Sequence, residues 1–343
     1  MRMRKRLSKP QIVFFIIFPF FHSVIEIIFL QVKEIQNMKY YKILSSDMTH
    51  HGFVYKEGLN IDTEPFDETP DCGGGLFFSD AQNILAFVNY GNLIAEIEVP
   101  NGTTIVQVKD KYKAHAIVLK NIKPIWTVDT FKYFIEEGIN IHAYNDYALR
   151  YVAENGNLEL VKFLVSKGAN IHSNNDFAFC YAAENGHLEV VQYLIDKGAD
   201  IHVQNDYALQ SASENGHIEV VRYLIDKGAN IHADDDYALR YAAGNGHLEI
   251  VQYLIDKGAD IHAYDDWALI SAAQTGHLEV VKYLIENGAN IHAKNDLAFC
   301  YATENGHIEV VKFLVSKGAN IHACNNYAFK FSTPNVITYL ETL

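Results

Sequence analysis

Apolar and polar positions follow a pattern along this chain that repeats every 30 residues from about residue 124 to the C-terminal end. In the unit 206–235, a helical run of apolar residues follows Asp206, which we interpret as a helix N-cap, and stops at Asn215 and Gly216. A second run places apolar side chains on one helical face, and Gly228 follows it as the C′ residue. That face consists of Ile218, Val221, Leu224 and Ile225. The pattern therefore predicts two short helices and a connecting loop in every unit.

The repeat is regular enough to predict a stacked array. Glycine recurs at the end of each second helix without a single insertion, and an Ile-His pair follows it in every unit. These glycines are Gly138, Gly168, Gly198, Gly228, Gly258, Gly288 and Gly318. Helices of about nine residues are marginal alone, so each unit must bury its apolar faces against its neighbours. We expect the glycines to adopt a left-handed backbone conformation.

The stretch ENGHLEVVQYLIDKGADIHV at 184–203 resembles the most characteristic half of an ankyrin repeat. Ankyrin units have a period of about 33 residues and open with Thr-Pro-Leu-His. This chain has a period of 30 and opens with Tyr-Ala-Leu-Arg or Phe-Ala-Phe-Cys, so the missing residues fall in the connection. The resemblance implies a mostly α fold, an ankyrin-repeat solenoid with shortened loops over residues 124–343. We expect six full units between two capping half-units, 124–141 and 326–343.

Residues 38–123 lack the repeat and combine strand-like runs with one helix-like run at 80–88. The strand-like runs lie at 40–44, 94–99, 104–108 and 116–119. We therefore expect a small α+β domain to precede the solenoid.

Residues 1–37 open with five basic side chains between Arg2 and Lys9, followed by the apolar run 12–21. Three interpretations are open. A secretory signal fits the basic start and the apolar core, but no clear small-x-small cleavage site follows. A membrane anchor needs about 20 apolar residues, and Pro19, His22 and Glu26 interrupt this run. The third interpretation is translated upstream sequence, with Met38 as the natural start of the domain.

Charge and cysteine usage narrow the range of partners and compartments. The net charge is −14, and because residues 1–37 are net positive, the remainder is near −18. Phosphate backbones repel such a chain, so we expect no nucleic-acid partner. Cys180 and Cys300 occupy the same repeat position four units apart and cannot meet. No disulfide framework is visible among the four cysteines, which favours a reducing compartment.

From Met38 onward, a small domain followed by ankyrin units with Ile-His in the loops resembles the ankyrin-repeat proteins of giant DNA viruses of amoebae. This resemblance implies a viral scaffold or adaptor that binds a host or viral protein, without a cofactor or an enzyme activity. We expect it in the host cytoplasm, or at a membrane if residues 1–37 are translated and retained. Nothing in the pattern implies an oligomer.

A weaker resemblance offers an alternative function for residues 38–123. The segments HHGFVYKEGLNI at 50–61 and GGLFFSDAQNILAF at 74–87 are similar to the His-Gly and Gly-(Ile/Leu)-Tyr-Phe-(Ala/Ser) segments of ADP-ribosyltransferases. The resemblance implies that His51 holds the nicotinamide ribose, that Phe77 or Phe78 packs on the ring, and that Glu96 or Glu98 is the catalytic acid. The family tyrosine is replaced at Phe77 and Phe78. The competing interpretation is a glycine turn at 73–75 beside core phenylalanines.

Twelve histidines lie in the repeats, seven in the Ile-His loops and five in the Gly-His turns. Equivalent histidines in successive layers lie about 10 Å apart, whereas zinc ligands lie within about 2.1 Å of the ion. We therefore expect no metal site, and we expect each imidazole to hydrogen-bond loop carbonyls of its own or the adjacent repeat. Acidic residues and serines recur in register with the repeat, so we expect no catalytic residue and no cofactor site in the array.

A partner-binding surface must lie where the units differ, since the shared residues form the scaffold. Three positions vary in each unit: the loop tip, the start of the first helix, and the position one turn further on. In ankyrin proteins the loop tips and first helices form the concave binding face, and aromatic and Arg residues dominate interface energetics. Our candidate partner-binding residues are Tyr144, Arg150, Asp234, Arg240, Tyr264 and Trp267. We expect the three aspartates at 234–236 to favour a basic partner. For the residues at the start of the first helix, the alternative interpretation is that they only pack between layers.

Overall fold

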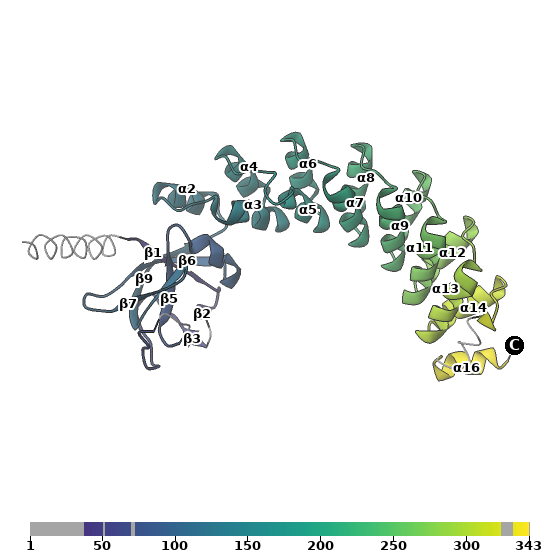
Figure 1. Ribbon diagram of the computed structural model, residues 1–343, viewed down its shortest axis with the longest axis horizontal. Coiled ribbons are helices and arrows are strands. Elements are labelled where there is room, and N and C mark those ends of the chain that lie inside the picture. Colours follow the sequence, from purple (N-terminus) through teal and green to yellow (C-terminus); the bar gives the residue numbers. More distant parts are fainter. Residues whose placement is uncertain (1–37, 51, 70–72, 324–331, 343) are drawn as a thin grey trace, which may run out of the picture. The chain divides into compact units, whose positions relative to one another are not determined.

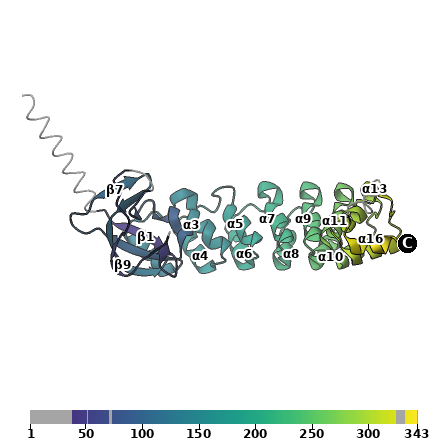
Figure 2. The ribbon, with the colours of Figure 1, turned by 90° about the horizontal axis from the view of Figure 1, so that it is seen from below.

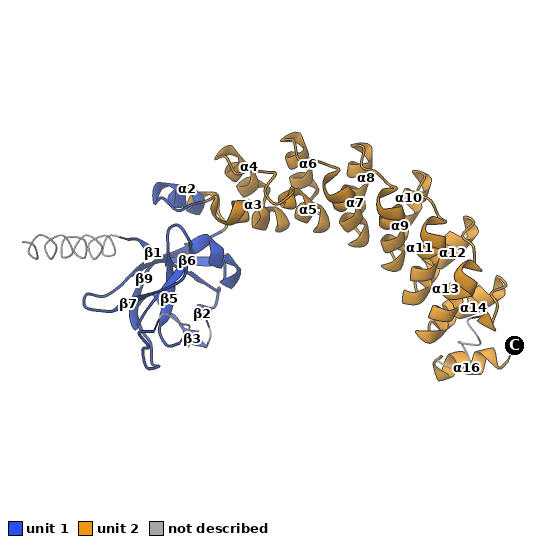
Figure 3. Ribbon diagram, in the orientation of Figure 1, with its two compact units in different colours: residues 1–125, 130–140 blue, residues 126–129, 141–343 orange. Residues whose placement is uncertain are grey.

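The computed structural model of this chain describes residues 38–50, 52–69, 73–323 and 332–342, and the chain divides into two units (Figures 1 and 3). Unit 1 comprises residues 1–125 and 130–140, and unit 2 comprises residues 126–129 and 141–343. The interpretations of residues 1–37 lie outside the described residues. Helix α2 (Val128–Glu136), which we expected within the first cap of the repeats, has most of its residues in unit 1.

Unit 1 contains a seven-stranded sheet in the order β4-β9-β6-β1-β5-β8-β7, in which all neighbouring strands are antiparallel. The runs predicted as strands at 40–44, 94–99, 104–108 and 116–119 all lie in this sheet, whereas β4, β5 and β8 were not predicted. A separate hairpin pairs β2 (Thr49–His50) with β3 (Phe53–Val54). The strands of the sheet are β1 (Tyr40–Leu44), β4 (Gly58–Ile61), β5 (Leu76–Asp80), β6 (Leu93–Glu98), β7 (Ile105–Val108), β8 (Lys111–Ala114) and β9 (Ala116–Pro124).

The core of unit 1 is built around Tyr40, whose ring meets Phe78 and Tyr112 edge to face at centroid distances of 5.0 and 5.1 Å. The helical run predicted at 80–88 is the 3-10 helix η1 (Ile84–Tyr90), which packs on β1 and β5. Helix α2 is tied to the sheet by a hydrogen bond from the Tyr133 hydroxyl to Glu96. These elements make unit 1 a sheet-rich α+β domain.

Unit 2 is a stack of helix pairs arranged in two rows (Figure 2). The predicted two-helix unit is therefore confirmed, and α16 (Pro334–Leu340) follows the last pair. The first helices are α3 (Ala143–Glu154), α5 (Phe177–Glu184), α7 (Val203–Glu214), α9 (Ala233–Gly244), α11 (Ala263–Thr275) and α13 (Ala293–Glu304). The second helices are α4 (Leu158–Ser166), α6 (Leu188–Asp196), α8 (Ile218–Asp226), α10 (Leu248–Asp256), α12 (Leu278–Glu286) and α14 (Ile308–Ser316).

Glycine ends every second helix in the left-handed conformation that the sequence predicts, with φ between +74° and +103° at the seven positions. A second series of glycines lies in the Asn-Gly turns and has an additional constraint. A Cβ atom built on Gly216 would lie 2.7 Å from Cε1 of His247 in the next repeat. By contrast, a Cβ on Gly228 would meet nothing within 4 Å. The first series therefore needs glycine for its backbone alone, and the second also needs it for space.

Six loops among the described residues contain a feature that the sequence did not predict: three consecutive residues other than glycine with φ between 47° and 60°. A left-handed conformation costs roughly 1–2 kcal/mol per residue, because Cβ crowds the following carbonyl oxygen. These left-handed turns need compensating interactions. They occupy residues 144–146, 174–176, 204–206, 234–236, 264–266 and 294–296.

The compensation comes from the third residue of each turn, a buried aspartate. Its carboxylate accepts a hydrogen bond from a backbone N–H in the next loop, 24 residues later, at 2.7–3.2 Å. It also contacts Nδ1 of the histidine four residues earlier at 2.6–3.1 Å. The aspartates are Asp146, Asp176, Asp206, Asp236, Asp266 and Asp296.

These contacts correct two expectations from the sequence. Asp206 does not cap its own helix, because its carboxylate binds the backbone N–H of Asn230 and Nδ1 of His202. The described Ile-His imidazoles of five further loops likewise contact a carboxylate, where we expected a loop carbonyl. A third correction concerns the cysteines: Cys180 is a buried free thiol, but Cys300 is disulfide-bonded, where we expected no disulfide.

Replacing Asp236 by Ala should lower the free energy of unfolding by about 2–3 kcal/mol more than replacing Asp235 by Ala. Asp236→Ala removes the acceptor of the Asp260 N–H and the partner of the His232 imidazole, and a hydrogen bond to a charged group contributes about 1.5–3 kcal/mol. Asp235 shares the left-handed backbone but is exposed, so it controls for the conformational effect of alanine. Urea denaturation of both variants measures the difference; equal losses would contradict the role of the buried carboxylate.

Replacing Gly216 by Ala should destabilise more than replacing Gly228 by Ala. Both variants strain a left-handed backbone, by about 1–2 kcal/mol, but only the first displaces His247, whose Nε2 donates to the carbonyl of Glu214 at 2.9 Å. Loss of that bond adds about 0.5–1.5 kcal/mol. Thermal melting distinguishes the two. A Gly228→Ala variant as stable as the parent would refute the helix-end strain.

Candidate functional site

The loop tips of unit 2 are the most exposed of the three variable columns. The side chains of Tyr144 and Tyr264 stand in solvent, with 45% and 56% of these residues exposed, and Asp234 is exposed as well. All three are the first residues of left-handed turns. Their position follows from the turn, because the aspartate two residues later is anchored inside and leaves the tip outside. The structure therefore presents these candidates to solvent.

The two candidate arginines have a structural role that the sequence did not reveal. Arg240 donates from Nε to the carbonyl of Asp235 at 2.8 Å and from Nη2 to the carbonyl of Asp234 at 2.7 Å. Arg150 makes the same contacts with its own turn, at 2.6 and 3.3 Å. Gln210 occupies this position in another unit and donates to the carbonyl of Asn205 at 2.7 Å. These three side chains satisfy carbonyls of the left-handed turn, so their donors are only partly available to a partner.

Tyr264 is the centre of a cluster that joins three consecutive repeats. The Arg240 guanidinium and the Lys294 ammonium lie 5.0 and 4.5 Å from the centre of its ring, and Trp267 meets it edge to face at 5.8 Å. Lys294 also lies 5.1 Å from the Trp267 ring and 3.6 Å from the Asp265 carboxylate. We call these residues the Tyr264 cluster. The candidate set contained three of its members and missed Lys294 and Asp265, neither of which is aromatic or an arginine.

The three aspartates at 234–236 have different environments. The Asp234 carboxylate accepts hydrogen bonds from Nδ2 of Asn205 at 2.5 Å and Nε2 of Gln210 at 3.1 Å. Asp236 is buried in the contact with the next loop. Only Asp235 has its carboxylate exposed without such a bond in the structure described. The negative charge available to a basic partner is therefore smaller than the sequence suggested.

Two tyrosines of the helix-start column contact the preceding layer. The Tyr207 and Tyr237 hydroxyls donate to Glu184 and Glu214 of the preceding repeats at 3.1 and 3.2 Å. Burial, followed by the charge of Glu184, raises the pKa of Tyr207 to about 12. Trp267 also belongs to the helix-start column and is half-buried.

At the start of the stack, Arg150 borders a hollow of about 360 Å³ between α3 and α5.

The histidines of the Gly-His turns link neighbouring repeats. Nε2 of His187, His247 and His307 binds a carbonyl oxygen of the preceding repeat at 2.8–3.0 Å, as we expected for this series. Burial is the largest cause that lowers the pKa of His217 and of His277, which favours their neutral form. Among the described residues, no group of three or more His, Cys, Asp or Glu side chains is arranged to hold a metal ion.

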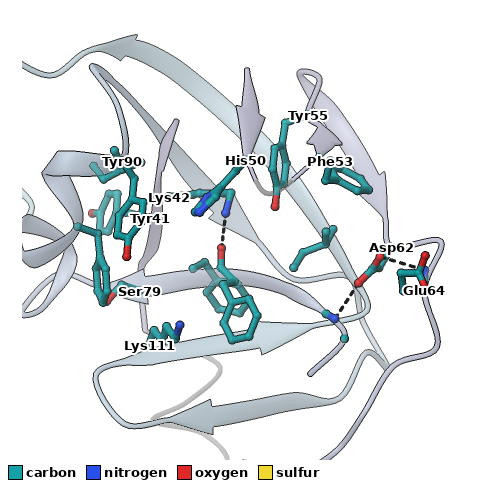
Figure 4. A pocket seen from close by; sticks show the side chains of 18 of the residues that line it. Tyr41, Lys42, His50, Phe53, Tyr55, Asp62, Glu64, Ser79, Tyr90 and Lys111 are labelled. Carbon is teal, nitrogen blue, oxygen red and sulfur yellow. Dashed lines mark hydrogen bonds between the residues drawn. The ribbon is translucent and has the colours of Figure 1, made fainter. Parts of the chain in front are cut away.

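Unit 1 contains a separate pocket of about 580 Å³ (Figure 4). Phe77 and Phe78 line it, but the candidate acids Glu96 and Glu98 do not. Glu96 binds the Tyr133 hydroxyl and the Asn121 amide, and Glu98 pairs with Lys120. His51 lies outside the described residues. The structure therefore does not place the acids of the transferase hypothesis in the pocket.

The side chain that distinguishes the pocket is Lys42 on the central strand β1, which the sequence did not single out. Only 3% of this residue is exposed, and its Nζ donates to the carbonyl of Phe77 at 2.6 Å. Burial, and then the positive charge of Lys111, lower the pKa of Lys42 to about 7. In the part of the chain that the structure describes, Lys42 has no carboxylate partner. Strongly perturbed groups in pockets are candidates for function.

Comparison with known proteins identifies the family. A family model of ankyrin repeats, in three copies, matches residues 126–205, 200–265 and 264–325. The chain belongs to the ankyrin repeat family. Among solved structures, the ankyrin repeat domain of human ASB11 is similar with a TM-score of 0.52 at 23% identity, covering 57% of this chain and 96% of that chain, which shows the fold alone.

Two relatives are ankyrin repeat proteins of Acanthamoeba polyphaga mimivirus. One is 34% identical over 132 residues, which are 35% of this chain and 43% of that protein. The other is 30% identical over 140 residues, which are 38% of this chain and 69% of that protein. The match thus spans less than half of the first relative. The expected resemblance to ankyrin proteins of giant viruses is confirmed.

None of the described helices is long and apolar enough to span a bilayer.

Replacing Lys42 by Met should stabilise the protein in a pH-dependent way. The folded pKa of about 7 lies below the ordinary value of 10.5, so the unfolded state binds more protons between these values and stability rises with pH. Below pH 7 the full penalty of the buried charge applies, at about 1.4 kcal/mol per pKa unit. The advantage of Lys42→Met should therefore be largest near pH 6 and shrink towards pH 10.5.

Urea denaturation across this pH range measures the effect, with Lys56→Met as the control. Lys56 is exposed, so its replacement should shift stability by a small amount that does not vary with pH. A Lys42→Met advantage that is constant across the range would show that the amine titrates normally in the folded protein.

Proposed function

We propose that this protein is a viral adaptor whose repeat array binds a protein through the Tyr264 cluster and the neighbouring loop tips. The observation that carries the proposal is the exposure of Tyr264 among residues that otherwise serve the scaffold. The buried aspartates, the turn glycines and the Gly-His imidazoles are all engaged in holding layers together. Tyr264, Trp267 and Lys294 vary between units and face solvent at least in part.

The position of the Tyr264 cluster within the repeat array supports this assignment. Within unit 2, the first helices α9, α11 and α13 line the inner side of the row and the second helices line the outer side (Figure 1). Exposed aromatic side chains give a large binding energy for a small loss of conformational entropy, which is why Tyr and Trp are enriched at binding hot spots. The cations stacked on Tyr264 restrict its ring before a partner arrives, which lowers the entropic cost of binding further.

The charges around the cluster favour a partner segment with basic and apolar side chains. The Arg240 donors are occupied by turn carbonyls, and Lys294 pairs with Asp265. Asp235 remains exposed beside them, and the chain as a whole carries a net charge of −14. A basic partner would be steered towards such a surface. We therefore expect affinity for the partner to fall as the salt concentration rises.

Replacing Tyr264 by Ala should weaken partner binding about tenfold or more, which corresponds to about 1.4 kcal/mol. The matched control is Tyr253→Ala. Tyr253 also carries a stacked cation, Arg222 at 4.5 Å, but it lies on the second helix α10. The partner is first isolated from infected host cells with the full-length protein, and its affinity for the parent and both variants is then measured by titration calorimetry.

Thermal melting of both variants checks that the array stays folded. Affinity lost in Tyr264→Ala and retained in Tyr253→Ala supports the inner face. Retained affinity in Tyr264→Ala, or equal losses in the two variants, would move the binding surface away from the Tyr264 cluster.

A further inference from the structure

The Lys42 amine combines three properties that seldom occur together: it is buried, it lacks a carboxylate partner in the described structure, and it lines an open pocket. Its Nζ donates to the Phe77 carbonyl at 2.6 Å and lies 4.5 Å from the centre of the Tyr55 ring. A lysine held by one carbonyl and one ring has little to stabilise its charge against the loss of water. Its neutral form has a lone pair and is a nucleophile.

The walls of the pocket define what could reach this amine. Phe77, Phe53 and Tyr90 supply aromatic surface, and the His50 ring stacks on Tyr90 at a centroid distance of 5.1 Å. Lys111 places its Nζ over the Phe77 ring at 4.3 Å, so a second cation borders the same space (Figure 4). The volume of about 580 Å³ is in the range of small-molecule sites.

Acidic groups of the pocket lie away from the amine. Asp62 and Glu64 are on the opposite side of the pocket from Lys111 (Figure 4). The Asp62 carboxylate accepts hydrogen bonds from the backbone N–H groups of Gly75 at 2.7 Å and Glu64 at 3.1 Å. These bonds use the charge of Asp62 to hold the 73–75 glycine turn, so the end of the pocket at Lys42 and Lys111 suits an anionic group.

We propose that Lys42 forms an imine with a small carbonyl compound that carries an anionic group, such as an oxo acid, and that Lys111 binds the anion. The Nζ lone pair attacks the carbonyl carbon, and a proton moves from nitrogen to the carbonyl oxygen to give a carbinolamine. Loss of one water molecule, which takes the second amine proton, gives the C=N bond. Protonation of this imine creates a cation that the Tyr55 ring face and the Phe77 carbonyl stabilise.

The chain provides a matched internal control in Lys113. Lys113 is 0% exposed and donates to a backbone carbonyl, that of Gly73, at 2.9 Å. It also approaches the Phe77 ring, at 6.0 Å, but it does not line the pocket. Both lysines are thus buried and donate to a backbone carbonyl, and access from the pocket differs.

The test treats the full-length folded protein with glyoxylate and sodium cyanoborohydride at pH 7, where the reductant converts an imine into a stable secondary amine. Peptide mapping by mass spectrometry then gives the rate of modification at each lysine. We expect Lys42 to be modified at least about tenfold faster than Lys113 and the exposed Lys56. Modification of Lys42 no faster than that of Lys113 would overturn the proposal.

A second comparison tests the role of Lys111. Lys111→Gln should slow the modification of Lys42 by glyoxylate, which is anionic, more than its modification by acetaldehyde, which is uncharged. Loss of the Lys111 charge raises the pKa of Lys42 for both reagents, but it removes the anion-binding group for glyoxylate alone. Circular dichroism confirms that the variant is folded. Equal effects on both reagents, or no effect on either, would overturn the assignment of Lys111 as the anion-binding group.

Discussion

The hydrogen bond that each buried turn aspartate accepts from a backbone N–H of the next loop is the interaction on which the repeat array depends. Three consecutive left-handed residues are unfavourable for L-amino acids, roughly in proportion to their number. The carboxylate compensates by accepting a hydrogen bond from a backbone N–H of the following loop and by contacting the histidine of its own loop. A charge-assisted bond of this kind is stronger than a neutral one. The same carboxylate therefore stabilises the shortened loop and joins it to the next layer.

Much of this architecture could be predicted because it is local. The 30-residue period, the helix pairs and the left-handed glycines follow from spacing and from the chemistry of helix ends. Asp206 was identified as special but was given the wrong partner, because its acceptor role connects loops 24 residues apart. Strand β8 was missed for a similar reason. Lys111 and Lys113 are polar in sequence, and only the folded sheet shows that Lys113 is buried.

The candidate site could be predicted in part. Variability and residue type selected Tyr264 and Trp267, and the structure shows that they lie in one cluster. The same criteria selected Arg240, whose guanidinium holds its own turn, and passed over Lys294. Lys42 gave no signal at all, since a lysine in a strand is ordinary until its surroundings are known. Its importance comes from burial by elements that are distant in sequence.

The buried aspartates of unit 2 and the buried Lys42 of unit 1 differ in how their charges are compensated. In unit 2, each inward aspartate has a backbone donor and an imidazole, so its charge is compensated and serves stability. In unit 1, the Lys42 amine contacts one backbone carbonyl and one aromatic ring. A compensated charge rigidifies its surroundings, whereas an uncompensated one remains available for chemistry or binding. The acidic array and the basic pocket wall illustrate these two outcomes within one chain.

The constant register of the links has a consequence for how such a chain can evolve. Every buried turn aspartate binds a backbone N–H 24 residues later, and the imidazoles of His187, His247 and His307 bind carbonyls 33 residues earlier. Unequal recombination between units of the gene, if it adds or removes whole periods, recreates these links at the new junction. The number of layers can therefore change in a single genetic event while each turn stays anchored. The tip residues, which the anchoring does not use, are then free to diverge.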